Sequence, residues 1–209
     1  MKDLVIYGAG GLGSEVLELV NNINKKSAIW NVIGFYDDYV QAGSVVSCKR
    51  VLGGLEDLCQ SDVKNVVIAI GNPEVRANLM LTLFEKEFPV LIHPTVVIPE
   101  ISVSIGSGSI IAANTFISVN TIIDKGVLIN VGCSIGHDVE IGKFCTINPG
   151  SRVSGSVKLG DGVFVGVGSI LNNNISIAND VKIGAGAVVL KSVEKKSTVF
   201  GNPARVVLE

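Results

Sequence analysis

A histidine followed by an acid is the clearest candidate for chemistry in this sequence. His137 and Asp138 lie in the run IGHDVE, residues 135–140, and the chain has two histidines in all. An unperturbed imidazole has a pKa of about 6.5, so near neutral pH its neutral form can take a proton from an attacking group. We interpret His137 as a candidate general base that Asp138 orients or stabilises when protonated. The alternative is a solvated surface histidine.

A glycine-rich turn near the N-terminus points to a phosphate site. The run GAGGLG, residues 8–13, fits GxGxxG, and Asp37 follows Gly13 by 24 residues. Such a turn at a helix N-terminus binds phosphate through backbone N–H groups, and an acid at this distance suits a ribose. We favour a nucleotide-diphosphate sugar over NAD, because a half-size sheet lacks the second half that a dinucleotide needs. The third reading is a turn needed only for tight strand–helix packing.

The other reactive side chains suggest no metal site. His93 precedes Pro94 where two differently patterned halves of the chain meet, and we read it as structural. The four cysteines have no CxxC or other metal-ligand spacing: Cys48, Cys59, Cys133 and Cys145. We expect reduced thiols in a cytoplasmic protein.

Composition excludes several classes of protein. Hydrophobic residues make up 47% of the 209 residues and charged residues 17%, yet no apolar run reaches the length of a membrane span. The start of the chain lacks a cleavable apolar region. The net charge is −2 with no basic block, which argues against nucleic acid as a partner. The apolar excess is therefore expected inside a core or between subunits, with no membrane contact.

A period of six decides the fold of the C-terminal half, and each repeating unit is called a hexad here. Stepping by one hexad from Ile105 gives fifteen positions that are all Ile, Leu or Val: Ile105, Ile111, Ile117, Ile123, Ile129, Ile135, Ile141, Ile147, Val153, Leu159, Val165, Leu171, Ile177, Ile183 and Val189. The residue four places after each is nearly always small or β-branched. Coils of three short strands, one strand from each hexad, stacked in parallel, account for this pattern. The register is expected to run unbroken to Val193.

The spacing of equivalent positions in successive coils predicts a glycine next to the candidate base. Gly155 lies three hexads after His137, so it occupies the same corner of the next coil. A residue without a side chain leaves space beside the imidazole and exposes a backbone N–H that can serve as an oxyanion donor. Cys133 and Cys145 occupy inward positions, so burial makes a covalent acyl-cysteine mechanism unfavourable.

Residues 1–92 instead predict a small parallel α/β sheet of Rossmann-like type. Buried strands are expected at residues 4–7, 32–36, 66–70 and 90–92. Ser14 is expected to cap the first helix, with an apolar stripe behind it. A short helix is expected near residues 55–58 and another from Gly71-Asn72-Pro73 to about Phe84. Alternating strands and helices favour a parallel sheet.

These motifs together resemble one group of bacterial sugar acetyltransferases. The runs GAGGLG, FYDD, IAIGNPEVR, IHPTVVI, GHD and FGNPARVV cover essentially the whole chain. The group includes UDP-4-amino-sugar N-acetyltransferases of the bacillosamine pathway, GDP-perosamine N-acetyltransferases and sialic acid O-acetyltransferases. The resemblance implies a left-handed β-helix over residues 93–209, including the C-terminal tail, behind a nucleotide-sugar-binding domain over residues 1–92. It also implies homotrimers with acetyl-CoA between the β-helices.

The resemblance also implies roles for particular residues. It makes His137 the general base, assisted by Asp138, whereas the role of Gly155 as oxyanion donor comes from the stacking of the coils. The nucleotide-sugar site would contain the residues that match the two glycine-containing loops and the acidic pair: Gly10, Gly11, Leu12, Asp37, Asp38, Gly71 and Asn72. The acetyl-CoA groove would match Thr146, Gly155, Val167 and Ala185. Basic residues of the tail are expected near the CoA phosphates: Lys191, Lys195, Lys196 and Arg205.

The implied activity is acetyl transfer from acetyl-CoA, without a metal, to the 4-amino group of a nucleotide-linked deoxysugar for surface glycan synthesis. The alternatives are O-acetylation of sialic acid or another sugar and a non-catalytic binding solenoid. Many relatives have histidine at Leu12 and some at Thr146, so the sequence leaves the sugar and the nucleotide base open. No long loop interrupts the hexads, so the substrate pocket needs walls from the N-terminal domain or a neighbouring subunit.

Overall fold

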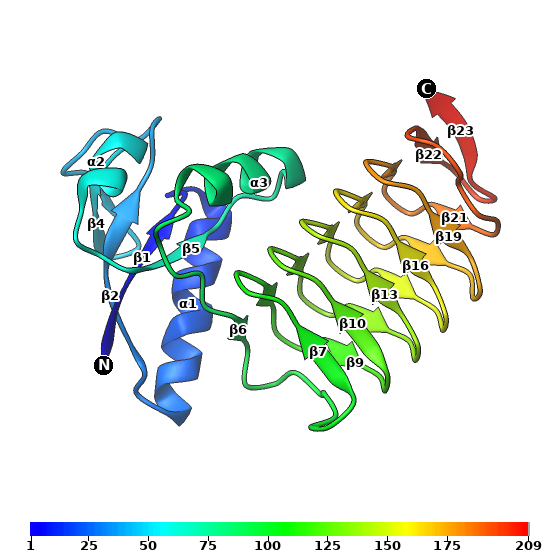
Figure 1. Ribbon diagram of the computed structural model, residues 1–209, viewed down its shortest axis with the longest axis horizontal. Coiled ribbons are helices and arrows are strands. Elements are labelled where there is room, and N and C mark those ends of the chain that lie inside the picture. Colours follow the sequence, from blue (N-terminus) through cyan, green and yellow to red (C-terminus); the bar gives the residue numbers. More distant parts are fainter. Residues whose placement is uncertain (209) are drawn as a thin grey trace.

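The computed structural model describes residues 1–208, which form an α/β unit followed by a long β-solenoid (Figure 1). The solenoid extends away from the α/β unit, so the two chain termini lie at opposite ends of the molecule. No helix among residues 1–208 is long and apolar enough to cross a membrane.

The N-terminal sheet has five strands in the order β3-β4-β2-β1-β5. Their bounds are Lys2–Tyr7 for β1, Trp30–Tyr36 for β2, Val45–Val46 for β3, Lys49–Gly53 for β4 and Asn65–Ile68 for β5. β1 pairs in parallel with β2 and β5, and β2 with β4, but β3 and β4 form an antiparallel hairpin. The all-parallel prediction was therefore wrong at this edge. The hairpin turns at Ser47 and Cys48, both with positive φ, and neither residue type signals such a turn.

Three helices accompany this sheet: α1 Gly11–Lys26, α2 Leu55–Gln60 and α3 Pro73–Thr82. α1 begins inside the glycine motif with Gly10 as its N-cap, so the prediction that Ser14 caps it was wrong. The Ser14 hydroxyl lies within the first turn and donates to the Gly10 carbonyl oxygen at 3.4 Å. Asn72 caps α3 by accepting hydrogen bonds from the Glu74 and Val75 N–H groups.

The solenoid has three faces of parallel strands, each named here after an early strand. The β7 face contains β7 Val103–Ile105, β10 Thr121–Ile123, β13 Glu140–Ile141, β16 Lys158–Leu159 and β19 Ser176–Ile177. The β8 face contains β6 Leu91–Ile92, β8 Ile110–Ile111, β11 Leu128–Ile129, β14 Thr146–Ile147, β17 Phe164–Val165, β20 Lys182–Ile183, β22 Thr198–Phe200 and β23 Arg205–Leu208. The last strand of this face, β23, runs antiparallel to β22. The β9 face contains β9 Phe116–Ile117, β12 Ser134–Ile135, β15 Arg152–Val153, β18 Ile170–Leu171 and β21 Val188–Val189.

The predicted stacking of hexads is confirmed. Ile123 pairs with Ile141 and Ile141 with Leu159, and the partners in each pair are three hexads apart. From Ile111 to Val189 every aliphatic of the hexad series is buried in one continuous core. Turn residues between the strands have a left-handed φ, including Asn120, Asp138 and Asn174, and Asn and Asp tolerate that conformation better than most residues.

The register shortens at the end of the solenoid. Leu171 pairs with Val189, a full three hexads on. Ile177 instead bridges to Val193, and Ile183 pairs with Val199, so both partners fall two positions short of three hexads. The prediction of an unbroken register to Val193 was therefore wrong by two positions. Val193 is aliphatic and fits either register, so the pattern alone could not detect the change.

The two parts join through the β8 face. β6 pairs with β8, with Leu91 opposite Ile110, so the expected fourth strand of the N-terminal sheet belongs to the solenoid. An apolar strand of this length carries no information about which sheet it joins. The outward side chains of Ile110 and Leu128 are buried in one cluster with α1 residues such as Leu19. Burying such a side chain stabilises the joint by roughly 1.5–3 kcal/mol.

Candidate active site

His137 lies at a solenoid corner, two positions after the inward Ile135 of β12. Its Nδ1 is 2.7 Å from Oδ2 of Asp138, and the two side chains are 61% and 51% exposed. Neighbouring side chains on a strand would point apart. Here the pair sits in a turn, and a left-handed φ of 58° at Asp138 turns its carboxylate toward the imidazole. The structure therefore brings together the predicted base and its acid.

The Asp138 carboxylate fixes which imidazole nitrogen is basic. Asn120 Nδ2 donates to Asp138 Oδ1 at 3.0 Å, one coil before. The hydrogen bond from His137, followed by that from Asn120, lowers the pKa of Asp138 below its ordinary value. An ionised carboxylate accepts from Nδ1–H, which leaves Nε2 as the lone-pair nitrogen in neutral His137.

Gly155 lies directly against that nitrogen. A Cβ atom built on Gly155 would be 2.6 Å from His137 Nε2, too close for a side chain. Gly136 in turn permits this approach, since a Cβ there would be 2.6 Å from the backbone nitrogen of Gly155. The predicted juxtaposition of His137 and Gly155 is present, and glycine is required on both sides of the contact.

The Gly155 N–H is open to an incoming oxygen atom. At two equivalent positions, two places after an inward aliphatic, the N–H donates to a side-chain oxygen instead: Lys143 N to Asp161 Oδ1 at 2.8 Å and Asp161 N to Asn179 Oδ1 at 2.9 Å. Among residues 1–208 no acceptor is bonded to the Gly155 N–H. This position in a coil can thus bind an external oxygen, as an oxyanion hole requires.

Replacing Asp138 with asparagine is expected to lower kcat roughly 3- to 10-fold, because an exposed carboxylate stabilises a protonated neighbour modestly. The Asp138 pKa is lowered, so its charge is present throughout the working range and is lost in the variant. The amide is neutral, so it stabilises the imidazolium that forms when His137 takes the proton less than the carboxylate does. Asp180→Asn is the control, because Asp180 has the same hexad position and a left-handed φ. An unchanged kcat in Asp138→Asn would contradict this role.

The glycine turn presents an open surface at the start of α1. Gly10 and Gly11 have no atoms within 4 Å of a built Cβ, as expected of a loop that a ligand approaches. Gly13 is different, since its Cβ would contact the Gly8 carbonyl oxygen, so it serves strand–helix packing. Leu12, which lies between Gly11 and Gly13, lines the cavity between α1 and the solenoid.

The acidic pair after β2 is held by the protein itself. Asp37 Oδ2 accepts from Ala9 N at 2.8 Å and its Oδ1 from Tyr39 N at 2.8 Å. Asp38 accepts from the Tyr7 hydroxyl at 2.7 Å and from Leu55 N at 2.7 Å. Asp37 therefore shapes the glycine turn, and a contact between this pair and a ribose stays a prediction.

Gly71, Asn72 and Thr146 meet at the joint between the two parts. Gly71 has open space where a Cβ would be, and Asn72 caps α3. Thr146 is fully buried, and its hydroxyl donates to the Gly71 carbonyl oxygen at 2.8 Å. The structure thus corrects the expectation that Thr146 lines the acetyl-CoA groove, because packing of the N-terminal part covers this section of the β8 face.

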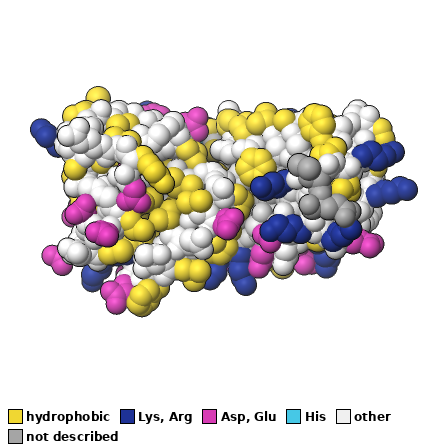
Figure 2. Space-filling model, turned by 90° about the horizontal axis from the view of Figure 1, so that it is seen from above, with side chains coloured by type: hydrophobic (Ala, Val, Ile, Leu, Met, Phe, Trp, Pro, Cys, Tyr) yellow, Lys and Arg dark blue, Asp and Glu magenta, His cyan; other side chains and the backbone are white. Residues whose placement is uncertain are grey.

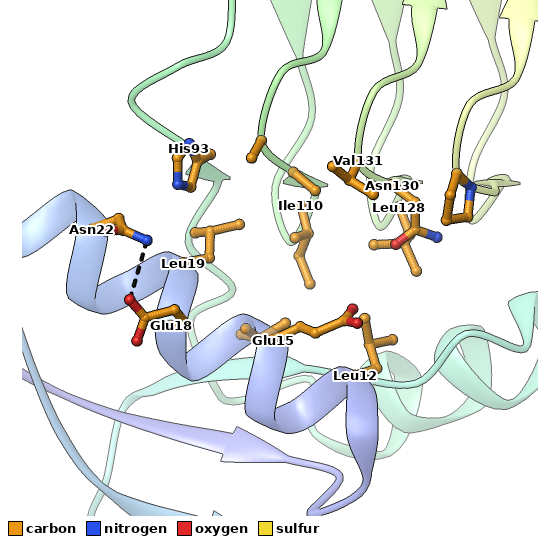
Figure 3. Close-up of a pocket in the computed structure, with 14 residues that line it drawn as sticks. Leu12, Glu15, Glu18, Leu19, Asn22, His93, Ile110, Leu128, Asn130 and Val131 are labelled. Carbon is orange, nitrogen blue, oxygen red and sulfur yellow. Dashed lines mark hydrogen bonds between the residues drawn. The ribbon is translucent and has the colours of Figure 1, made fainter. Parts of the chain in front are cut away.

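A cavity of about 340 Å³ separates α1 from the solenoid. In Figure 3, Leu12, Glu15 and Leu19 of α1 point toward Ile110 and Leu128 of the β8 face. Glu15 and Glu18 are the charged residues that line it, and within the described chain neither lysine nor arginine does. Sequence reasoning missed Glu15, although its place two residues after the glycine motif, on the same side of the helix as Leu12 and Leu19, was a usable signal.

The cavity borders the solenoid corner on which two of the predicted cofactor residues lie. Ala113, Val131 and Pro149 line it, each two positions after an inward aliphatic of the β8 face. Val167 and Ala185 continue that corner in the next two coils and are exposed. His137 and Gly155 lie at a different corner, after the β9 face. One chain therefore presents the two halves of the predicted site on separate edges.

Lysine and arginine side chains gather toward the C-terminal end of the molecule (Figure 2). Lys191, Lys195 and Arg205 line a second cavity of about 820 Å³ at that end. Lys196 instead pairs with Asp180 at 3.6 Å. The tail thus concentrates positive charge at the end of the solenoid, at the distal end of the Val167–Ala185 corner.

Comparison with known proteins identifies relatives along the whole chain. The model of the PglD N-terminal domain family matches residues 3–83. GDP-perosamine N-acetyltransferase of Escherichia coli O157:H7 is 33% identical over 144 residues, which are 68% of this chain and 65% of that relative. The aligned part thus spans just under two thirds of the curated relative's length.

Solved structures match over nearly the full length. Perosamine N-acetyltransferase from Caulobacter crescentus, a histidine-to-asparagine variant in complex with CoA and GDP-perosamine, has a TM-score of 0.91 and 26% identity and covers 100% of this chain and 98% of that chain. The acetyltransferase domain of PglB from Neisseria gonorrhoeae, with acetyl coenzyme A, has a TM-score of 0.88 and 27% identity, with 99% of both chains covered. WeeI from Acinetobacter baumannii has a TM-score of 0.87 and 30% identity, and the match covers 99% of this chain and 100% of that chain.

The fold and the matches define a class of transferase in which an α/β unit precedes a solenoid of hexads. The chain belongs to the hexapeptide-repeat acetyltransferase family that includes perosamine N-acetyltransferase and the PglB acetyltransferase, with an N-terminal domain of PglD type. The predicted family, fold class and enzyme class are confirmed.

Proposed function

We propose that this protein transfers the acetyl group of acetyl-CoA to the amino group of a nucleotide-linked amino-deoxysugar for glycan biosynthesis. The observation that carries the proposal is the cavity between α1 and the β8 face, which reaches Pro149, one coil before Val167 on the same corner. The Caulobacter relative, bound to CoA and GDP-perosamine, and the Neisseria relative, bound to acetyl coenzyme A, support the same pair of ligands.

The cavity suits an amino sugar that lacks a hydroxyl group. Glu15 has no hydrogen bond or ion pair within the described chain, and its carboxylate faces the cavity. An amine is cationic near neutral pH, and a carboxylate attracts it as an ion pair. Leu12, Leu19, Ile110 and Leu128 provide apolar surface for the methyl group of a deoxysugar. The acceptor is thus an amine rather than an alcohol.

The reaction needs one base and one oxyanion donor. After the bound ammonium group loses a proton to solvent, the neutral nitrogen attacks the thioester carbonyl carbon and His137 Nε2 takes its second proton. The carbonyl oxygen becomes an oxyanion that accepts from the Gly155 N–H. Collapse of this intermediate breaks the C–S bond, and the CoA thiolate takes the proton from the imidazolium.

The thiols of the core take no part in this reaction. Cys145 is buried, its thiol donates to the Gly160 carbonyl oxygen at 3.0 Å, and burial raises its pKa to about 12. Burial also raises the pKa of Cys133. A nucleophilic cysteine needs an accessible thiolate, so direct transfer is preferred to an acyl-cysteine intermediate.

A homotrimer completes the site. His137 and the Val167–Ala185 corner lie on different edges of one solenoid, so the edge of one copy must face that of another to assemble base, thioester and acceptor. A closed ring of three copies repeats this contact between unlike edges at every interface, with acetyl-CoA between copies. The tail residues Lys191, Lys195, Lys196 and Arg205 would then contact the CoA phosphates.

Thermal shift with a panel of nucleotide sugars, each with and without CoA, tests the proposal. A ligand that binds only the native state raises Tm, so an amino-sugar nucleotide such as GDP-perosamine should give the largest joint stabilisation. Mass spectrometry should then find an acetylated amine. Acetylation of a sugar alcohol such as sialic acid alone would overturn the amine assignment, and no calorimetric binding of acetyl-CoA would indicate a non-catalytic solenoid.

Glu15→Gln is expected to raise KM for the amino-sugar nucleotide about tenfold, because one charge-assisted hydrogen bond to a cation stabilises by roughly 1.5–3 kcal/mol. KM for acetyl-CoA should stay unchanged. Glu18→Gln, one turn further along α1, is the matched control, because Asn21, Asn22 and Lys25 already contact its carboxylate. Equal KM values in the two variants would remove Glu15 from the acceptor site.

A further inference from the structure

One arginine joins the N-terminal part to the solenoid. Arg76, in α3, is 1% exposed and is the largest side chain that is fully buried among the described residues. Its Nε donates to the Gly126 carbonyl oxygen at 2.7 Å, across the joint. Nη2 also reaches the solenoid and donates to the carbonyl oxygens of Phe144 and Cys145 and to Thr146 Oγ1 at 2.6, 3.0 and 2.9 Å.

The same guanidinium holds the loop that follows β5. Its Nη1 donates to the carbonyl oxygens of Ile70 and Gly71 at 2.7 and 3.3 Å. The Thr146 hydroxyl, which accepts from Arg76, donates to the Gly71 oxygen at 2.8 Å. Two coils of the solenoid are thus connected through one side chain to the Gly71–Asn72 loop, whose outer side is open.

No carboxylate balances this buried charge within the described chain, and all its acceptors are neutral oxygens. Burial lowers the pKa of Arg76 to about 10, so it stays charged at neutral pH. Burying an ion without a counter-ion costs free energy that apolar packing would not. The joint also holds Phe144 at a left-handed φ of 59°, where glycine occupies the same hexad position at Gly108, Gly126 and Gly162. Such costs are typical of sites where geometry matters for function.

We propose that Arg76 is a positioning residue that fixes the Gly71–Asn72 loop against the solenoid, so that the nucleotide part of the acceptor meets a preformed loop. The identity of the ligand rests on the proposed function, whereas the fixed position of the loop does not. Arginine is required because its planar fork reaches oxygens in several directions at once, whereas a lysine ammonium reaches from one point.

Arg76→Lys and Thr146→Val test this inference. Lysine at position 76 keeps the charge but lacks the planar guanidinium and its several N–H donors. Valine at position 146 keeps the shape of threonine and removes the hydroxyl between Arg76 and Gly71. Leu79→Ala is the control, because Leu79 is buried in α3 within the N-terminal core and makes no contact across the joint. It lowers Tm without touching the loop.

The first readout is amide hydrogen exchange, which requires no substrate. In Arg76→Lys and Thr146→Val, exchange should rise at residues 74–76 of α3 and, across the joint, at Gly126 and Phe144. In Leu79→Ala the faster exchange should stay within the N-terminal part, where Leu79 packs. If the solenoid amides exchange no faster in Arg76→Lys or Thr146→Val than in Leu79→Ala, the inference is wrong.

The second readout is kinetic, with GDP-perosamine as the acceptor probe. KM for this probe should rise at least tenfold in Arg76→Lys and by a smaller factor in Thr146→Val, with KM for acetyl-CoA within twofold of the unaltered chain. Equal increases in both KM values would overturn the positioning role while the proposed function stood. Absence of turnover in the unaltered chain would count against the proposed function, and hydrogen exchange alone would then decide the role of Arg76.

Discussion

Replacing His137 with alanine should lower kcat by about 100-fold or more while the protein keeps its fold and its assembly, because general base catalysis typically contributes 10²–10⁴-fold. Nε2 has an open lone pair against Gly155, and within one chain the other histidine, His93, lies apart from it at the interdomain cavity. The side chain is exposed, so its removal leaves no cavity in the core. Steady-state kinetics and sedimentation would check both parts of the expectation.

Two further histidine variants sharpen this test. His137→Asn can still bond to Asp138 but has no base at Nε2, so its kcat should fall as far as that of His137→Ala. His93→Ala should leave kcat close to that of the unaltered chain, because Nδ1 of His93 is engaged with Thr95 at 2.9 Å in a local turn. Unchanged turnover in His137→Ala would remove the residue from the mechanism.

Adding a single methyl group at Gly155 should be nearly as damaging. In Gly155→Ala the new Cβ would lie 2.6 Å from His137 Nε2 and occupy the space that the thioester carbonyl needs. We expect kcat to fall about 100-fold, comparable to the loss of one oxyanion donor. Gly155 does not have a left-handed φ, so its backbone accepts alanine and Tm should change little.

Asn173→Ala is the control for Gly155→Ala. Asn173 lies three hexads after Gly155, at the same corner of the next coil, and is exposed. Its truncation changes the same column without filling the space beside His137, so kcat should be preserved. A fully active Gly155→Ala enzyme would show that the acyl group does not pass this glycine. Loss of activity in both variants would indicate a disturbance of the corner as a whole.

Much of the solenoid could be predicted from the sequence, because its contacts are fixed by a constant spacing. The hexad period places each aliphatic on its equivalent one coil away, so Ile123 and Ile141 had to pair and His137 had to approach Gly155. The same periodicity hid the shortened register before Val193, because an aliphatic residue satisfies both registers. The β3–β4 hairpin was missed because Ser47 and Cys48 adopt positive φ without glycine or asparagine.

The sequence by itself thus determined the family, the coil geometry and the neighbourhood of His137, all of which depend on spacing along the chain. Only the tertiary structure decided how the two parts meet. The sequence alone does not distinguish Arg76 from other helix residues or Thr146 from other strand residues. When α3 packs on the β8 face, Arg76 is buried and joins the two parts, and Thr146 is covered and cannot line the cofactor groove. Glu15 likewise faces a cavity only because α1 lies opposite Ile110 and Leu128 in the folded chain. These contacts join residues far apart in sequence through packing of unlike elements, which no local period encodes.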